Sequence, residues 1–343
     1  MRDRAAAFAP GRVNLIGEFT DYNEGLALPF AISQGVTVRA ARTEEDRIEA
    51  FALDLDAYDS FERERPVRAP GWCGFVRGAV AELQQAGAQI PGARLQISGT
   101  VPRGSGLSSS AALEVALCLA LLALADAPVP DRLELAQICS RIENEWVGAR
   151  TGLLDQIASL YGERDSAMRI DFRSLEVSNV ALDLGGFSLV TLDSGERHAN
   201  AVSGYNQRRE ECARACAQLG VASLREVTFE MAAGLPDPLA SRARHIIGEN
   251  IRVQEAVSAL QTRDLLALGR LLDASHASLR DAYEVSTPAV EATVERLQRA
   301  GAVGARIVGG GFGGSVLGLL PPGVGQPDGA VVVTPGPGAH LVP

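Results

Sequence analysis

The sequence predicts a protein of mixed α-helices and β-strands, built as two packed domains or as one large domain. The chain has 343 residues, which is too many for one ordinary hydrophobic core. Apolar and polar residues alternate over 95–98, as in a half-buried strand. Apolar residues then run without interruption from Val115 to Ala125, as in a buried helix. Two strand-like apolar runs flank a glycine-rich segment at 309–315.

The composition is that of a globular chain. Hydrophobic residues make up 46% of the sequence and charged residues 22%, and there is no internal repeat or low-complexity tract. The formal net charge of -10 would repel a phosphate backbone, so we do not expect a nucleic-acid partner. The N-terminus lacks the apolar run of a secretory signal, and no apolar run is long enough to span a bilayer. We therefore expect a cytoplasmic protein without a membrane partner, whose five cysteines are free thiols.

The basic residues exclude two classes of nucleotide site. All 32 residues counted as lysine or arginine are arginines, because the chain contains no lysine. A Walker-type phosphate loop needs a lysine, and so does the protein-kinase fold. Any phosphate must therefore be held by backbone amides, hydroxyls, arginine or a metal ion.

A dense polar segment runs from Gly11 to Gly25 between apolar stretches and contains Arg12, Glu18 and Asp21. Because the two carboxylates are three residues apart, one bend can bring them together, and each can accept several hydroxyl hydrogen bonds. The glycines let the backbone come close to a ligand. Such a segment is typical of a site for a small polyhydroxylated ligand, although a surface loop is the simpler alternative.

A second segment, Val101 to Ala112, has the composition of a phosphate cradle. Its glycine- and serine-rich loop follows a strand that ends near Gly99 and precedes a helix over 111–125, with a serine just before the helix as its N-cap. This order directs unpaired N–H groups and the positive end of the helix dipole to one point, where a phosphate chain can bind. Many loops of this composition are only connectors.

Two further clusters are candidate site elements. The glycines of 309–315 indicate a close approach of the backbone to a ligand or to another segment, or a hairpin turn. One helix is predicted from Asp131 to a stop at Gly148, and a second, short helix begins near Gly152. Asp155 lies among apolar residues of that second helix. An acid there is usually a cap or a hydrogen-bonded group, and as a catalytic base it needs a nearby cation.

Together these segments resemble the galactokinases of the GHMP sugar and metabolite kinase superfamily, in order from Pro10 to about Leu320. The N-terminal segment resembles the galactokinase signature, residues 101–112 the phosphate loop of the superfamily, and residues 309–315 its third motif. Further collinear matches occur at 204–212, 242–250 and 275–280. So many matches in one order are hard to produce by chance.

The resemblance implies an α+β protein with the two-domain GHMP kinase fold and an active site in the interdomain cleft. Residues 1–177 would form the N-terminal domain, of the ribosomal protein S5 domain 2-like type, and residues 178–343 the GHMP C-terminal domain. The last strand, near 330–333, would return to the first domain. We find no flexible linker at the boundary, where residues 173–179 are predicted as a polar turn.

The resemblance also implies an ATP-dependent sugar 1-kinase, first of all a galactokinase, which transfers the γ-phosphoryl group to the anomeric hydroxyl of D-galactose. Asp155 would take the proton from that hydroxyl, while Arg12 would keep the carboxylate ionised and offset charge on the transferring group. The other sugar contacts carried over from the family are Glu18, Asp21, Gly152 and Tyr205. The partner would be a monosaccharide, and the family suggests a monomer or a weak homodimer.

Further residues are carried over for ATP and Mg²⁺. The ATP-binding residues would be Gly104, Ser105, Gly106, Leu107, Ser108, Ser109 and Ser110, with Trp72 and Phe75 near the adenine. Two aromatic residues at this spacing are more often part of a core. Mg²⁺ would be bound by phosphate oxygens, by Glu143 and by a loop serine, Ser109 or Ser110.

Phe19 departs from the family pattern, because galactokinases usually carry histidine there, close to the sixth carbon of the sugar. Phenylalanine cannot hydrogen-bond a hydroxyl, so galactose would bind more weakly, or the preferred sugar would be one such as arabinose or a C6-modified galactose. A non-catalytic sugar sensor of the same fold is a further alternative, disfavoured by the intact run of residues 110–112. An actin-like sugar kinase, hinted at by residues 182–186, and a mevalonate or homoserine kinase fit the motifs less well.

Overall fold

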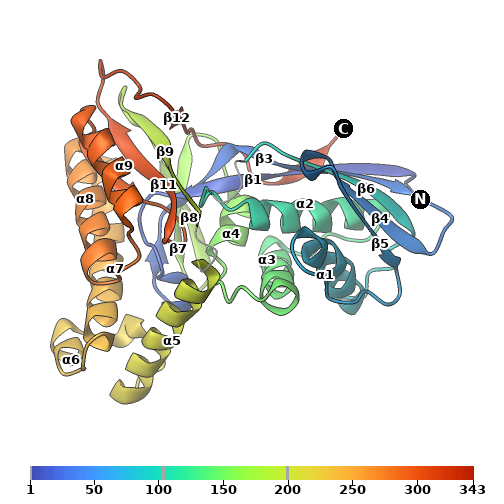
Figure 1. Ribbon diagram of the computed structural model, residues 1–343, viewed down its shortest axis with the longest axis horizontal. Coiled ribbons are helices and arrows are strands. Elements are labelled where there is room, and N and C mark those ends of the chain that lie inside the picture. The colour runs from blue at the N-terminus through green and yellow to red at the C-terminus, as the bar shows by residue number, and fades with distance from the viewer. Residues whose placement is uncertain (1, 102–104, 198–200) are drawn as a thin grey trace.

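The structure is a computed structural model that describes residues 2–101, 105–197 and 201–343. A six-stranded sheet forms one side of the molecule, in the order β13-β1-β3-β6-β4-β5, with one face covered by four helices (Figure 1). Its strands are β1 (Arg4–Asn14), β3 (Pro29–Arg42), β4 (Arg47–Ala52), β5 (Ala57–Glu62), β6 (Ala93–Gly99) and β13 (His340–Val342). The helices are α1 (Trp72–Gln85), α2 (Ser109–Leu124), α3 (Arg132–Arg141) and α4 (Leu154–Tyr161).

Helix α2 lies at the centre of this half because its sequence is apolar on all sides rather than on one face. It packs on β1 and β3 and also contacts α1, α3 and α4. The predicted strand and helix are therefore confirmed as β6 and α2, while residues 102–104 of the loop between them lie outside the described residues. The helix begins at Ser109, two residues before the predicted start at Ala111.

The other half of the molecule consists of a second sheet and a set of longer helices (Figure 1). The sheet is antiparallel, in the order β10-β11-β9-β12, and is formed by β9 (Ser188–Arg197), β10 (Gly304–Ile307), β11 (Gly313–Leu320) and β12 (Val331–Val332). Its helices are α5 (Ala201–Leu219), α6 (Phe229–Ala233), α7 (Leu239–Thr262), α8 (Leu265–Asp281) and α9 (Pro288–Arg299). None of the helices in the described parts of the chain is long and apolar enough to cross a membrane.

A small antiparallel sheet connects the two halves. It consists of β2 (Leu26–Ala27), β7 (Ser166–Asp171) and β8 (Glu176–Ala181), in the order β2-β7-β8. Strand β7 also contacts β3 of the large sheet, while α7 packs on β2 and β8. The N-terminal polar segment enters this region, so its position depends on elements from both halves of the chain.

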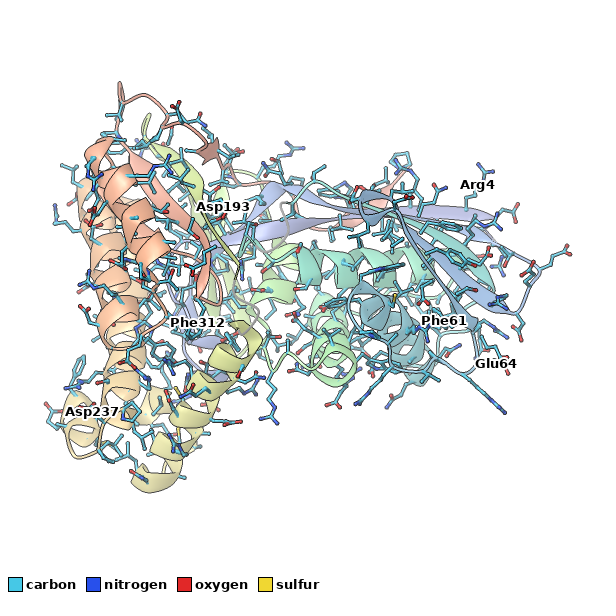
Figure 2. All side chains as sticks on the ribbon, in the orientation of Figure 1. Arg4, Phe61, Glu64, Asp193, Asp237 and Phe312 are labelled. Carbon is cyan, nitrogen blue, oxygen red and sulfur yellow. The ribbon has the colours of Figure 1, made fainter. Side chains whose placement is uncertain are left out.

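The glycine-rich segment joins two antiparallel strands, β10 and β11, as its flanking apolar runs predicted. Phe312 of this segment packs against α5, where a Cβ at Gly204 would lie 2.6 Å from the ring (Figure 2). Gly204 therefore has a steric role, because the absence of a side chain lets α5 approach the loop.

The strand predicted to return to the first half was assigned to the wrong residues. The strand at 331–332 is β12, which pairs with β9 and stays in the second sheet. The segment that returns is β13, which pairs with β1. Glycine and proline residues between the two strands permit this path, because Gly338 lies so close to α4 that a Cβ would be 2.6 Å from the Leu160 carbonyl oxygen.

The predicted polar turn at 173–179 is too long. The turn occupies residues 172–175, and β8 begins at Glu176 and pairs along its whole length with β7. Polar residues in β8 give a weak strand signal, but cross-strand pairing outweighs that preference. The proposed domain boundary at residue 177 consequently falls inside a strand.

Candidate active site

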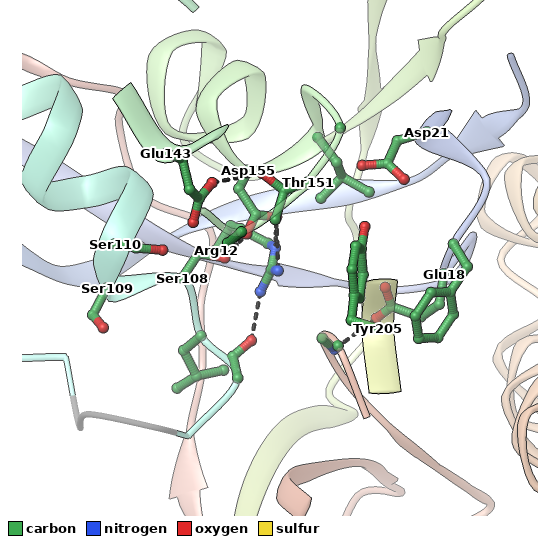
Figure 3. A pocket seen from close by; sticks show the side chains of 18 of the residues that line it. Arg12, Glu18, Asp21, Ser108, Ser109, Ser110, Glu143, Thr151, Asp155 and Tyr205 are labelled. Atoms are coloured by element: carbon green, nitrogen blue, oxygen red, sulfur yellow. Dashed lines mark hydrogen bonds and ion pairs between the residues drawn. The ribbon is translucent and has the colours of Figure 1, made fainter. Parts of the chain in front are cut away.

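Side chains from both halves of the chain line a cavity of about 290 Å³ (Figure 3). Its lining includes most of the predicted sugar, phosphate and metal residues: Arg12, Glu18, Phe19, Asp21, Gly106, Leu107, Ser108, Ser109, Ser110, Glu143, Gly152, Asp155 and Tyr205. Ser105 does not line it, but its carbonyl oxygen accepts a hydrogen bond from the Ser315 N–H of the third motif at 3.0 Å. Gly104 lies outside the described residues.

Arg12 and Asp155 meet at the wall of this cavity, as the sequence analysis predicted. Nε of Arg12 donates a hydrogen bond to Oδ1 of Asp155 at 2.7 Å, and Nη2 lies 2.7 Å from the same oxygen. Nη1 of Arg12 donates to the carbonyl oxygen of Gly106 at 2.6 Å. The arginine side chain is only 6% exposed, whereas the aspartate side chain is 21% exposed. The guanidinium is thus fixed behind a carboxylate that a ligand can reach.

Ser108 is the N-cap residue of α2, but its hydroxyl does not cap the helix. The hydroxyl donates instead to Oδ2 of Asp155, and the residue adopts a left-handed φ of 57°. The prediction of a capping serine before Ala111 was therefore wrong in both position and role. The Ser108 side chain thus leaves the N–H groups at the start of α2 uncapped, and Ser109 and Ser110 of the first turn line the cavity.

The phosphate loop and the third motif touch through their glycines. A Cβ at Gly106 would lie 2.9 Å from the carbonyl oxygen of Val308, and a Cβ at Gly309 would lie 2.8 Å from that of Gly106. Both glycines also have positive φ angles. Two of the alternatives for 309–315 are confirmed, because the segment is the hairpin connection between β10 and β11 and also approaches another segment closely, while Gly309 and Gly310 line the cavity.

Glu143 lies in an unusual stretch of helix. The predicted helix starts with Asp131 as its N-cap and stops at Gly148 as expected, but residues 142–147 form a π-helix. Such widened turns are frequent at functional sites. The turn directs the Glu143 carboxylate inward, where Oε2 accepts hydrogen bonds from the Thr151 hydroxyl at 2.7 Å and the Gln156 amide at 3.0 Å.

The surroundings of Glu143 fit a divalent cation. Burial raises the pKa of its carboxyl, and the neighbouring Asp155 carboxylate raises it further. Ser110, which lines the same cavity as Glu143, acts in the opposite direction and lowers this pKa. Mg²⁺ bound to a nucleotide needs few protein ligands, and one carboxylate with one hydroxyl meets that need. Within the described residues no group of three or more His, Cys, Asp or Glu side chains forms a closed metal site.

Asp21 and Gly152 fit against each other on another side of the cavity. A Cβ at Gly152 would lie 2.2 Å from Oδ2 of Asp21, so any larger residue would displace the carboxylate. Burial and the nearby Asp155 carboxylate raise the pKa of Asp21 to about 6. The backbone N–H of Tyr22 donates to Oδ1 of Asp21 at 3.0 Å.

Phe19 gives the cavity an aromatic wall where the family pattern has a polar residue. Its side chain is buried, and its φ of 65° is rare for an aromatic residue. The ring lies 4.6 Å from that of Tyr283 and 5.5 Å from that of Tyr205, centroid to centroid. The ring of His245 lies 6.5 Å away.

His245 orders the backbone beside Phe19. Burial lowers its pKa to about 4, so the imidazole is neutral at pH 7. Its Nε2 lies 3.2 Å from the carbonyl oxygen of Glu18 and its Nδ1 2.8 Å from the Ser278 hydroxyl. Because a carbonyl only accepts, we assign the proton to Nε2, and Nδ1 then accepts from Ser278.

A second cavity, of about 540 Å³, adjoins the phosphate loop. Trp72 and Phe75 of α1 line it together with residues of β3 and β6. Ser109 and Ser110 line both cavities. Trp72 and Phe75, the residues predicted to contact the adenine, therefore lie beside the predicted phosphate loop.

Several residues of the site were not predicted. Thr151 and Gln156 donate hydrogen bonds to Glu143, and their only signal in the sequence is that each is the direct neighbour of a predicted residue. Arg306 is fully buried and lies 3.3 Å from Glu18. The sequence indicates this residue only by placing an arginine inside an otherwise apolar strand. Glu249 accepts a hydrogen bond from the Gly17 N–H at 3.0 Å, which explains the match at 242–250.

Comparison with known proteins agrees with this geometry. Family models match the galactokinase galactose-binding signature at residues 2–42, the GHMP kinase N-terminal domain at 74–163 and the GHMP kinase C-terminal domain at 256–326. The chain is 41% identical to a galactokinase of Actinobacillus pleuropneumoniae over 326 residues, which cover 92% of this chain and 84% of the relative. It is 43% identical to a galactokinase of Mycobacterium tuberculosis, over 91% of this chain and 88% of the relative.

Solved structures show the same relationship. The galactokinase of Lactococcus lactis, solved in complex with galactose, superimposes with a TM-score of 0.92 at 33% identity, over 99% of this chain and 95% of that one. A mevalonate kinase shares the fold, with a TM-score of 0.67 at 18% identity, over 92% of this chain and 91% of that one. This chain has the two-domain GHMP kinase fold and belongs to the galactokinase family.

Proposed function

We propose that this chain is an ATP-dependent galactokinase, which converts ATP and D-galactose into ADP and galactose 1-phosphate. Family membership supports the reaction class. The observation that carries the proposal is the position of Asp155. Its carboxylate is bonded by Arg12 and Ser108 in the first cavity, and that cavity shares two loop serines with the second.

Asp155 acts as the general base in this proposal. Its carboxylate takes the proton of the anomeric hydroxyl as that oxygen bonds to the γ-phosphorus, and the bond from the γ-phosphorus to the bridging oxygen breaks to release ADP. Arg12 holds the carboxylate in place and offsets negative charge that gathers on the transferring group. Positioning and charge stabilisation supply most of the acceleration in phosphoryl transfer.

The remaining residues bind the two substrates. The carboxylates of Glu18 and Asp21 accept hydrogen bonds from sugar hydroxyls. The ring of Tyr205 packs on the sugar, and Gly152 leaves room for the sugar. Backbone and hydroxyl groups of residues 104–110 hold the phosphates of ATP, while Trp72 and Phe75 contact the adenine. Glu143 and Ser110 would hold Mg²⁺, which would neutralise charge on the phosphate oxygens.

A second candidate is an anomeric kinase for a sugar other than galactose. The observation that favours it is the buried phenyl ring of Phe19, packed against Tyr205 and Tyr283. An apolar wall there would favour a sugar that lacks the hydroxymethyl group, such as arabinose, or one modified at C6. We therefore propose galactose as the first substrate to test and these sugars as its competitors.

The proposal also covers the domain boundaries, the oligomeric state and the cellular location of the protein. Residues 1–177 and 178–343 would form the two domains, supported by a hydrophobic core drawn, apart from Ala339, from residues before 178. The protein would act as a monomer or a weak homodimer, which sedimentation velocity at several concentrations would test. We place the reaction in the cytoplasm, where ATP and free thiols coexist.

A panel of free hexoses and pentoses, incubated with the purified chain and Mg-ATP, tests the function. We expect ADP release with galactose and a phosphate on the anomeric oxygen, read by ³¹P and ¹H NMR. Absence of ADP release with every monosaccharide would overturn the proposal. Phosphorylation at another hydroxyl would overturn the assignment of the anomeric oxygen as the acceptor.

A further inference from the structure

Arg306 stands out among the buried charges of this molecule. It lies on β10, between Ala305 and Ile307, in a strand that is otherwise apolar apart from its first glycine. It is the largest fully buried side chain in the described part of the chain. Removing a guanidinium from water is costly unless the charge is paired and hydrogen-bonded, so the partners of this side chain indicate what it does.

Those partners all belong to the N-terminal polar segment. Nη1 of Arg306 donates hydrogen bonds to the carbonyl oxygens of Asn14 at 2.9 Å and Leu15 at 3.0 Å. Nη2 lies 3.3 Å from Oε1 of Glu18. Among the described residues, Nε and Nη2 have no hydrogen-bond partner, and Glu18 is the only carboxylate within ion-pair distance. Glu18 is thus the carboxylate in ion-pair contact with Arg306, while the buried Glu249 carboxyl lies near enough for Arg306 to help lower its pKa.

Glu18 is held on its other side by the loop that follows β10. The backbone N–H of Gly309 donates to Oε1 of Glu18 at 2.9 Å (Figure 3). Arg306 and Gly309 thus fix the same oxygen from two points of one short segment. This arrangement leaves Oε2 to accept a hydrogen bond from a ligand in the cavity that Glu18 lines.

The two carbonyl contacts extend this control to the backbone. Asn14 and Leu15 precede the bend that carries Glu18 and Phe19, and the N–H of Gly17 is held separately by Glu249. A neutral or shorter side chain at position 306 would free both carbonyl groups and the carboxylate together. The bend would then lose its attachment to β10 while α7 still held it at Gly17.

We infer that Arg306 is a positioning residue for sugar recognition, which sets the orientation of the Glu18 carboxylate from the opposite half of the chain. This inference rests on the proposed function, because it takes Glu18 as a sugar contact. Arg306 touches no cavity space itself, so it acts only through Glu18 and the bend. The third motif contributes to the same arrangement through the N–H of Gly309, besides its contact with the phosphate loop.

A double-mutant cycle separates this role from a merely structural one. We compare the wild type with Arg306→Met, Glu18→Gln and the double variant, measuring kcat, the KM for galactose, the KM for ATP and the melting temperature. We expect Arg306→Met to raise the KM for galactose about tenfold or more, with little change in the KM for ATP. In the Glu18→Gln background the same substitution should have a much smaller effect, because its target is gone.

Two further variants keep the test decisive if Arg306→Met folds poorly. Arg306→Lys retains the charge but not the fork that reaches two carbonyl groups, so we expect an intermediate KM for galactose. Arg77→Met removes a guanidinium that pairs with Asp59 at 2.7 Å in the first half of the molecule, away from the sugar residues. It should lower the melting temperature without changing the KM for galactose.

Each outcome decides a separate point. An unchanged KM for galactose in Arg306→Met and Arg306→Lys overturns the inference, as do effects that simply multiply in the double variant. If the wild type phosphorylates no sugar, the proposed function fails, and calorimetric binding of galactose to the same variants decides the inference. A wild type that neither phosphorylates nor binds a monosaccharide overturns both.

Discussion

Two arginine–carboxylate pairs stand on two sides of the same cavity and are built differently. In the Arg12–Asp155 pair, two nitrogens lie 2.7 Å from one oxygen, and the carboxylate is 21% exposed. In the Arg306–Glu18 pair, the nearest nitrogen and oxygen are 3.3 Å apart, and the carboxylate is only 6% exposed. A carboxylate that must accept a proton from a substrate has to be reachable, whereas one that only orients a substrate can be more enclosed.

Each arginine also ties its carboxylate to a different part of the backbone. Arg12 reaches the carbonyl oxygen of Gly106 in the phosphate loop, while Arg306 reaches those of Asn14 and Leu15. The first pair therefore couples the proposed base to the proposed phosphate loop. The second couples the proposed sugar contact to the bend that carries it. Under the proposed function, two separate buried cations thus support the base and the sugar contact.

The largest expected difference between the pairs is in turnover. Asp155→Ala should lower kcat by about 10³-fold or more while ATP affinity stays nearly unchanged, because a positioned general base contributes ~10²–10⁴-fold and its arginine loses its target. Glu18→Gln should act mainly on the KM for galactose. Steady-state ADP release gives kcat and KM, and calorimetry with a non-hydrolysable nucleotide gives ATP affinity.

Asp155→Asn serves as the matched control, since the amide keeps the shape but cannot take the proton. It should be as slow as Asp155→Ala and more stable. Normal turnover in either variant would refute the assignment of the base. A kcat loss in Glu18→Gln as large as that in Asp155→Ala would show that the two arginine–carboxylate pairs do not have different roles.

Asp21 provides a second, smaller test, because it faces the cavity without an ion-pair partner among the described residues. Its pKa is raised to about 6 by burial and by Asp155. The folded state therefore binds this proton more tightly than the unfolded state, in which the pKa of Asp21 is near 3.8. The contribution of this proton to the free energy of unfolding is complete below pH 3.8 and is lost as the pH rises through about 6.

Asp21→Asn removes this loss. We expect the variant to exceed the wild type in unfolding free energy by about 1 to 2 kcal/mol at pH 7.5, as one pKa unit corresponds to ~1.4 kcal/mol and the carboxyl keeps some contact with water. The gain should disappear below about pH 4. Urea unfolding of both proteins across this range measures the difference. A gain that does not vary with pH would show that Asp21 titrates normally.

The sequence was sufficient to predict those parts of the site that lie in local motifs. The polar segment from Gly11 to Gly25, the serine loop and the glycine-rich segment each have a local pattern, and the cavity brings all three together. The contact of Arg12 with Asp155 required the family resemblance, because no local rule joins residues 143 positions apart. The π-helix around Glu143 was missed, since its pattern is that of an ordinary helix.

Roles that depend on tertiary contacts were also missed. Arg306 reads as an anomaly inside an apolar strand until its distance to Glu18 is known. The serine before Ala111 was predicted as the helix cap, but the N-cap position belongs to Ser108, whose hydroxyl forms a charge-assisted bond to the nearby Asp155 carboxylate instead. The short strand β12 was assigned to the wrong sheet because two valines show no preference between partners. In each case the deciding partner lies far away in the chain.

The smallest expected effect concerns the aromatic wall beside Glu18. Phe19→His introduces a donor and an acceptor next to the sugar site, and histidine tolerates the left-handed φ of 65° better than phenylalanine does. One added hydrogen bond contributes about 0.5 to 1.5 kcal/mol, so kcat/KM for galactose relative to arabinose should rise about two- to tenfold.

Phe19→Leu is the matched control, because it changes shape without adding a polar group and should leave this ratio unaltered. Paired ADP-release assays with the two sugars measure the ratio. Equal ratios in the wild type and both variants would show that position 19 does not set specificity, and sugar choice would then be assigned to Glu18 and Asp21 alone.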